Sequence, residues 1–136
     1  MRLGDEAVSS MYRAINSMKK ELGIKGKHSV FKYECPETYN NGEAYIVINF
    51  LPFVHNKVVS EGDVNVNVHV PQTSEKEPDG VKLAKVTRGI AEYFSDAVYM
   101  DGFYFEFYAD SRPVKDSDGT YYVNLKFKVT YNDLKD

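Results

Sequence analysis

The chain has 136 residues, of which 43% are hydrophobic and 27% charged, with a net charge of −3 and a single cysteine, Cys35. This composition indicates a globular chain and excludes a disordered one. One cysteine excludes an intrachain disulfide, and the negative net charge argues against a dedicated nucleic-acid surface, which needs a clustered excess of Lys and Arg.

The first predicted element is a helix near the N-terminus. Asp5 is its predicted N-cap and Gly23 its predicted C-terminal stop. We expect this helix to cover a sheet; the alternative is a helix that binds a partner. Its apolar stripe follows the three- and four-residue steps of an amphipathic helix: Val8, Met11, Tyr12, Ile15, Met18 and Leu22.

Two predicted strands come next. Residues 28–34 form a short candidate strand, with Phe31 and Tyr33 on one face. Residues 44–51 are almost continuously apolar and rich in β-branched side chains, which is typical of a central strand covered on both faces. Pro52 ends this strand, because proline has no N–H to donate.

Residues 63–70 alternate strictly between valine and polar side chains. This period of two predicts a strand with one buried and one solvated face. After a polar loop the period changes, and an apolar stripe predicts a helix over 81–94 with Asp79 as its N-cap. We expect this helix to lie on the valine face of the strand. The stripe consists of Val81, Leu83, Ala84, Val86, Ile90, Ala91 and Phe94.

The last part of the chain predicts a long antiparallel hairpin. Residues 103–110 and 121–131 alternate with period two, and the turn cluster 116–119 (Asp-Ser-Asp-Gly) lies between them. Its outward rows are expected to pair acidic with basic side chains across the strands: Glu106 and Asp110 with Lys126 and Lys128.

These elements occur in the order α-β-β-β-α-β-β. They predict an α+β fold in which residues 1–136 form one domain. We expect a single antiparallel or mixed sheet of four to five strands with both helices packed on one face.

The search for reactive groups predicts no catalytic residues, no cofactor and no metal, and therefore no enzyme. The three histidines, His28, His55 and His69, have no metal-ligand spacing. His28 and His69 are expected to be solvated strand residues, and Cys35 an inert thiol. The cluster at 116–119 is similar to the start of a calcium loop, but no glutamate closes such a loop, so we interpret it as a hairpin turn.

The stretch 46–94 contains VINFLP, EGDVNVNVHVP and DGVKLAKVTRGI. It resembles the small tail-completion or tail-terminator proteins of long-tailed bacteriophages and prophages. In that family a helix precedes the sheet, a strand ending in Val-Pro precedes the long helix, and a hairpin ends the chain. The chain departs from the family in one respect: Lys82 and Lys85 stand where an arginine is usual early in the second helix.

This resemblance implies a structural protein that forms rings, often hexameric, at the head-proximal end of the tail tube. It implies three partners: further copies of the chain, the tail tube and the head connector. It also implies a location in the bacterial cytoplasm during assembly and then in the virion tail. The alternatives are a monomeric protein- or ligand-binding module and, third, an enzyme or enzyme subunit. No membrane partner is expected, because no apolar run approaches the ~20 residues that span a bilayer.

We expect the working surface to be the sheet face opposite the valines. An uncovered face that carries tyrosine suits a protein partner, because each ring buries a large area at low entropic cost. The alternative is a solvated face with no partner. The candidate interface residues are Asn65, Asn67, His69, Tyr104, Tyr108 and Tyr122.

Overall fold

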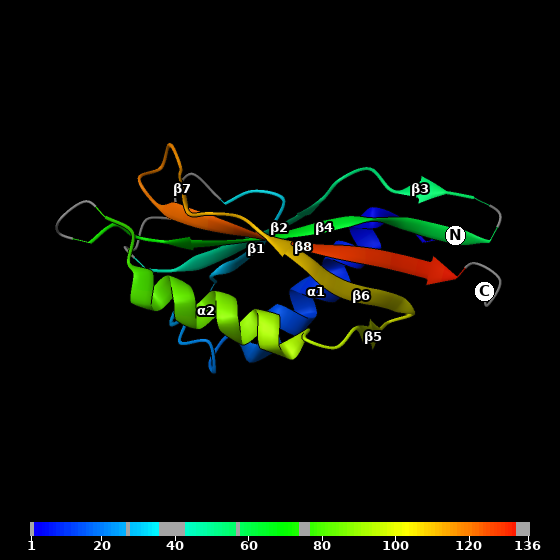
Figure 1. Cartoon of the computed structure of the whole chain (residues 1–136), viewed down its shortest axis with the longest axis horizontal. Coiled ribbons are helices and arrows are strands. Elements are labelled where there is room, and N and C mark those ends of the chain that lie inside the picture. The colour runs from blue at the N-terminus through cyan, green and yellow to red at the C-terminus, as the bar shows by residue number, and fades with distance from the viewer. Residues whose placement is uncertain (1, 27, 36–42, 57, 74–76, 133–136) are drawn as a thin grey trace.

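The computed structural model describes residues 2–26, 28–35, 43–56, 58–73 and 77–132. Figure 1 shows its strands as one curled layer with both helices on the same side of it. Neither described helix is long and apolar enough to cross a membrane. The elements are, in chain order, α1 (Gly4–Met18), β1 (Val30–Lys32), β2 (Tyr45–Phe50), β3 (Val54–His55), β4 (Val59–Val70), α2 (Gly80–Tyr93), β5 (Val98–Met100), β6 (Phe103–Asp110), β7 (Val114–Lys115) and β8 (Tyr121–Asn132).

All the strands belong to one sheet. Its main path runs β1-β2-β4-β8-β6-β5, while β3 pairs with β4 and β7 pairs with β8. The pair β1–β2 is parallel, and every other pair is antiparallel. The two longest strands, β4 and β8, pair along their whole length in the middle of the sheet.

The predicted fold class is wrong. The described part of the chain is mostly β, with eight strands in one curled mixed sheet in place of an α+β fold with four to five strands. The side-chain pattern gives no sign of β3, β5 and β7, because strands of two or three residues are too short to show alternation. Each of these short strands pairs with a longer one, β3 with β4, β5 with β6 and β7 with β8. The pairing gives hydrogen-bond partners to backbone N–H and C=O groups of the longer strand.

The predicted strand 28–34 is shorter in the structure, where it is β1. Its alternation stops at Tyr33, whose φ of 72° lies outside the extended region. The predicted strand at 44–51 is β2, which lies between β1 and β4 and is buried from Tyr45 to Ile48. Its predicted burial on both faces is confirmed for these residues, but the strand is second from the edge of the main path and not at its centre.

The predicted contact between α2 and the valine face of β4 is confirmed. All four valines of β4 that follow Gly62 are fully buried, and α2 packs against β4 and β8. Leu83, Val86, Ile90 and Phe94 are buried on the helix side. Val81 is 85% exposed and Ala84 is also exposed, so neither belongs to the buried stripe. Because each residue turns a helix by about 100°, Val81 and Leu83 point in nearly opposite directions.

Asp79 caps α2 as predicted, since its side chain accepts a hydrogen bond from the Lys82 backbone N–H at 3.1 Å. Asp5 does not cap α1, and that prediction is wrong. The helix begins at Gly4 with Leu3 as its N-cap, and Asp5 lies inside the first turn. A side chain at Gly4 would collide with the Phe50 ring, its Cβ coming within 2.3 Å, so a residue without a side chain lets α1 begin against β2.

Replacing Asp79 with alanine is expected to lower the free energy of unfolding by about 1 kcal/mol, because the Lys82 N–H loses its acceptor. Urea unfolding measures the loss. Asp79→Asn is the matched control, since asparagine also caps helices well and should lose little. An equal loss in both variants would contradict a capping role for the side chain.

The predicted hairpin is formed by β6 and β8, and Glu106 lies opposite Lys128 as predicted. The prediction for Asp110 is wrong. A bulge between Phe107 and Ala109 places Ala109 opposite Lys126 and Asp110 opposite Leu125. The extra residue moves Asp110 to the helix side of the sheet, because one added residue reverses the side to which later side chains point.

Candidate interaction face

We call the side of the sheet away from the helices the open face. The strand registers decide which side chains lie on it, because successive residues of a strand point to opposite sides. Tyr45 lies opposite His69, which lies opposite Tyr122, so these three form one row across β2, β4 and β8. Two further rows follow along β4: Asn67 lies opposite Val47 and Asn124, and Asn65 lies opposite Asn49 and Lys126.

Four asparagines form a hydrogen-bonded network at the centre of the open face. The Asn65 Nδ2 donates to Asn49 Oδ1 at 2.9 Å, and the Asn124 Nδ2 donates to Asn67 Oδ1 at 2.8 Å and to Asn65 Oδ1 at 3.3 Å. Asn65 is only 8% exposed. The side-chain amides therefore bond chiefly to one another. The network connects β2, β4 and β8 through side chains, in addition to the backbone hydrogen bonds of the sheet.

His69 is also buried, with 6% of its surface exposed, which makes the prediction of a solvated histidine wrong. Its ring stacks on Tyr45 with centroids 4.4 Å apart and on Tyr122 at 5.0 Å. His28 is exposed, but it lies before β1 and belongs to no described strand, so it is not the strand residue that was predicted. The position of the His69 ring between two tyrosine rings explains part of the burial of His69.

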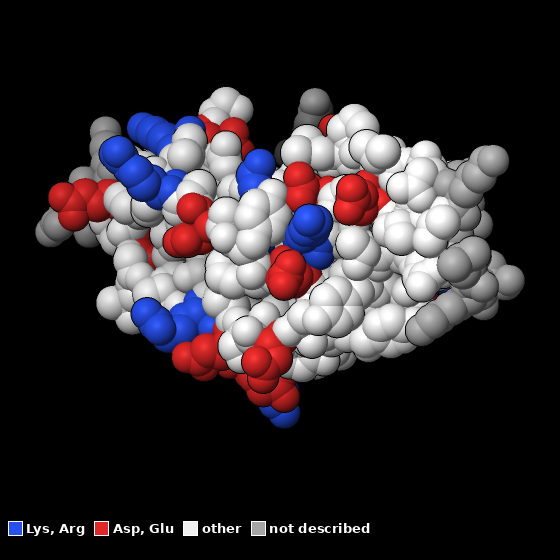
Figure 2. Space-filling view, turned by 45° about the vertical axis from the view of Figure 1, so that its right-hand side comes forward, with Lys and Arg blue, Asp and Glu red and all other residues white. Residues whose placement is uncertain are grey.

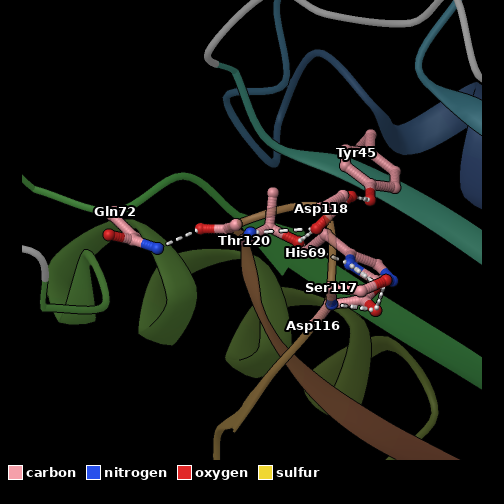
Figure 3. Close-up of polar contacts among 8 residues, drawn as sticks. Tyr45, His69, Gln72, Asp116, Ser117, Asp118 and Thr120 are labelled. Atoms are coloured by element: carbon pink, nitrogen blue, oxygen red, sulfur yellow. Dashed lines mark hydrogen bonds and ion pairs between the residues drawn. The ribbon is translucent and has the colours of Figure 1, made fainter.

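The turn between β7 and β8 lies against His69, and Figure 3 shows its residues Asp116, Asp118 and Thr120 beside the ring. The His69 Nδ1 lies 3.0 Å from Thr120 Oγ1 and 3.7 Å from Asp116 Oδ2. Asp118 accepts hydrogen bonds from the Tyr45 hydroxyl and, at 2.6 Å, from the Thr120 hydroxyl. Because the Thr120 proton is directed to Asp118, its oxygen accepts from His69, and in its neutral form the imidazole is the tautomer with the proton on Nδ1.

The electrostatics of this cluster fit that tautomer. Burial lowers the pKa of His69 and outweighs the opposing influence of the Asp116 and Asp118 carboxylates. Burial would raise the pKa of Asp118, but hydrogen bonds from Thr120 and Tyr45 bring it below its ordinary value. The pKa of the Tyr45 hydroxyl is raised by burial and by its bond to Asp118. At neutral pH the cluster therefore holds a neutral imidazole beside the ionised Asp118 carboxylate.

Metal ions in proteins are commonly held by His, Cys, Asp and Glu side chains. In the described part of the chain, one group of three such residues has its ligand atoms within 4.8 Å of one another: His69, Asp116 and Asp118. That spacing could hold a metal ion. In the structure these three residues hydrogen-bond within the turn and to the sheet: His69 Nδ1 with Thr120, Asp118 with Tyr45 and Thr120, and Asp116 Oδ1 with the Ser117 N–H at 2.7 Å. We therefore assign the cluster to hydrogen bonding that fastens the turn to the sheet.

The burial of Cys35 is intermediate, and burial raises the pKa of its thiol, with the charge of Asp118 adding to the effect. Such a thiol is protonated at neutral pH and is a poor nucleophile. These properties agree with the interpretation of Cys35 as inert.

Tyr104 and Tyr108 lie on β6, on either side of Glu106 along the strand. They are 45% and 51% exposed, and the Tyr108 hydroxyl donates to Asp63 Oδ1 at 3.0 Å. Lys128 lies between Asp63 on one neighbouring strand and Glu106 on the other. Figure 2 shows charges of opposite sign interleaved over the centre and left of its view, with few charges among the described residues on the right.

The structure thus divides the six predicted interface residues. Asn65 and Asn67 join the asparagine network, His69 and Tyr122 share one stack, and Tyr104 and Tyr108 lie on the exposed strip of β6. The sequence analysis did not identify Tyr45, Thr120 or Asn49 as parts of this face. Tyr45 and Asn49 come next to β4 through strand pairing, and Thr120 through the conformation of the turn. The alternation of side chains along one strand predicts neither of these.

On the helix side, a cavity of about 320 Å³ lies between α2 and the strands β6 and β8. Phe107 and Leu125 give it an apolar floor, and Arg88, Glu92 and Asp110 bring charges to it. Asp110 reaches this cavity because of the bulge in β6. The cavity is a candidate site for a small ligand or for a side chain of a partner.

No protein-family model matches the sequence, and no curated protein matches it significantly.

Proposed function

We propose that the chain is a structural protein of phage tail assembly, active in tail termination, tail completion or head–tail joining. In this proposal copies of the chain associate into a ring and dock the tail tube or the head connector through the open face. No catalytic step is involved. The protein would act in the bacterial cytoplasm during assembly and then remain in the virion tail.

The observation that carries the proposal is the pair of exposed tyrosines on the uncovered side of the sheet. Both helices lie on the opposite side, so Tyr104 and Tyr108 project from a face that no described element covers at that position. Exposed aromatic side chains beside a strip of alternating charge suit protein contacts, in which aromatic anchors supply area and the charges set register. The resemblance of residues 46–94 to tail-completion proteins points the same way.

The proposal is tested by deleting the coding region from a phage genome that encodes it and examining the particles by electron microscopy. We expect tails of irregular length or tails that fail to join heads, and restoration by the wild-type gene in trans. Analytical ultracentrifugation of the purified chain, alone and with tail tubes, reports ring formation. Normal particles after deletion would contradict the proposal.

The second candidate function is a monomeric binding module, which the charged cavity beside α2 favours. An apolar floor with Arg88 on one side and Glu92 and Asp110 near it has the composition of a pocket that recognises a partly charged ligand. A chain that stays monomeric with and without tail tubes, and whose thermal stability rises with a ligand but not after Asp110→Ala, would favour this function.

A further inference from the structure

We infer that the turn between β7 and β8 is a pH-operated clasp. It lies on His69 while the imidazole is neutral, and it lifts from the sheet when the imidazole takes up a second proton. We define the clasp as residues 116–120. The clasp is a property of the isolated chain, so this inference goes beyond the proposed role in tail assembly and can fail or hold independently of it.

A small set of hydrogen bonds holds the clasp on the sheet. Thr120 accepts from His69, Asp118 accepts from the Tyr45 hydroxyl, and the Gly119 carbonyl accepts from the Gln72 Nε2 at 2.6 Å. Within the clasp, the Asp116 N–H donates to the Thr120 carbonyl at 2.8 Å. Two of these three contacts converge on the row that contains His69, and the third is with Gln72, just after the end of β4.

An added proton must go to the Nε2 of His69, because Nδ1 already donates to Thr120. No described residue accepts a hydrogen bond from Nε2, and the ring is buried between Tyr45 from β2 and Tyr122 from β8. The charged groups that face the ring belong to the clasp itself, Asp116 and Asp118. A buried cation without a partner at Nε2 is costly, so protonation favours a state in which water reaches the ring.

The direction of the pH effect follows from the two states. With the clasp closed, burial holds the pKa of His69 below its ordinary value. With the clasp open, the imidazole is hydrated and titrates near the ordinary value of about 6.5. The open state therefore binds more protons as the pH falls below that value. The opening constant rises by up to about tenfold per pH unit between the two pKa values and stays constant above them.

Amide hydrogen exchange tests the clasp in the intact chain. Protection of the Asp116, Gly119 and Thr120 amides is measured from pH 7.5 to 5.5 and corrected for the intrinsic exchange rate at each pH. We expect protection of these three amides to fall as the pH drops below 6.5, while amides of the central β4–β8 ladder keep theirs. Unchanged protection of the clasp over this range would overturn the inference.

Two variants make the test specific. His69→Gln keeps a side-chain N–H but cannot be protonated, so the pH dependence of clasp protection should disappear. His55→Gln is the matched control, because the His55 Nδ1 also lies beside a hydroxyl, 2.8 Å from Ser60 Oγ, at the other end of β4. This control should keep the wild-type pH dependence. The same pH dependence in His69→Gln as in the wild type would overturn the inference.

If His69→Gln does not fold, NMR titration of the wild-type His69 ring decides. We expect its midpoint to lie below the ordinary value and to coincide with shifts of the Gly119 and Thr120 amides. A midpoint at or above the ordinary value would overturn the inference, because protonation would then strengthen the closed state.

Discussion

Replacing Ile90 or Leu83 with alanine is expected to lower the free energy of unfolding by about 2–5 kcal/mol. Ile90 is fully buried and Leu83 nearly so, both in the core between α2 and the sheet. The loss has two sources: the transfer energy of the deleted methyl and methylene groups, and the cavity they leave in a close-packed core. Denaturant unfolding monitored by circular dichroism measures it.

Val81→Ala is the control for these variants, because Val81 lies in the same helix and is largely exposed. Its loss should stay within about 0.5 kcal/mol, as for most surface substitutions. A loss near zero for Ile90→Ala and Leu83→Ala, or a loss in Val81→Ala as large as theirs, would show that α2 does not bury the face described here.

A chain with serine at both Tyr104 and Tyr108 is expected to fold normally and to fail in assembly. Both side chains are exposed on the open face, and among the residues that the structure describes their one side-chain hydrogen bond is that of Tyr108 with Asp63. The substitution therefore removes aromatic contact area without opening the core. Its readouts are the urea midpoint, tail length and head joining in phage that carry the double variant.

The matched control is Tyr93→Ser, since Tyr93 is exposed to a similar degree but lies at the end of α2 on the opposite side of the sheet. Assembly should survive this change. Unchanged tail length and normal head joining in the Tyr104/Tyr108 double variant would rule out the open face as the working surface.

Some structure in this chain follows from sequence alone because it depends on local periodicity. Four valines at every second position predict one buried face of β4, and Leu83, Val86, Ile90 and Phe94 predict the buried stripe of α2. The Asp79 cap follows from the same kind of local pattern. In each case the preference of a short segment agrees with the packing of the whole fold.

The position of Asp110 shows where this reasoning stops. Alternation from Phe103 onward predicts that Asp110 points outward beside Lys126. A bulge at Tyr108 reverses the two sides, so Asp110 lies beside the cavity with Arg88. A bulge depends on how two strands accommodate their twist and curvature, and a single strand read by itself carries no sign of it.

His69 makes the same point for the candidate site. Its place on the non-valine side of β4 is a local property, and the sequence determines it. Its burial is not local: Tyr45, Tyr122 and Thr120 reach it from two other strands and from a turn far along the chain. Local sequence determines which way a side chain points, whereas tertiary structure decides what covers it, because burial depends on segments that meet only after the sheet has assembled.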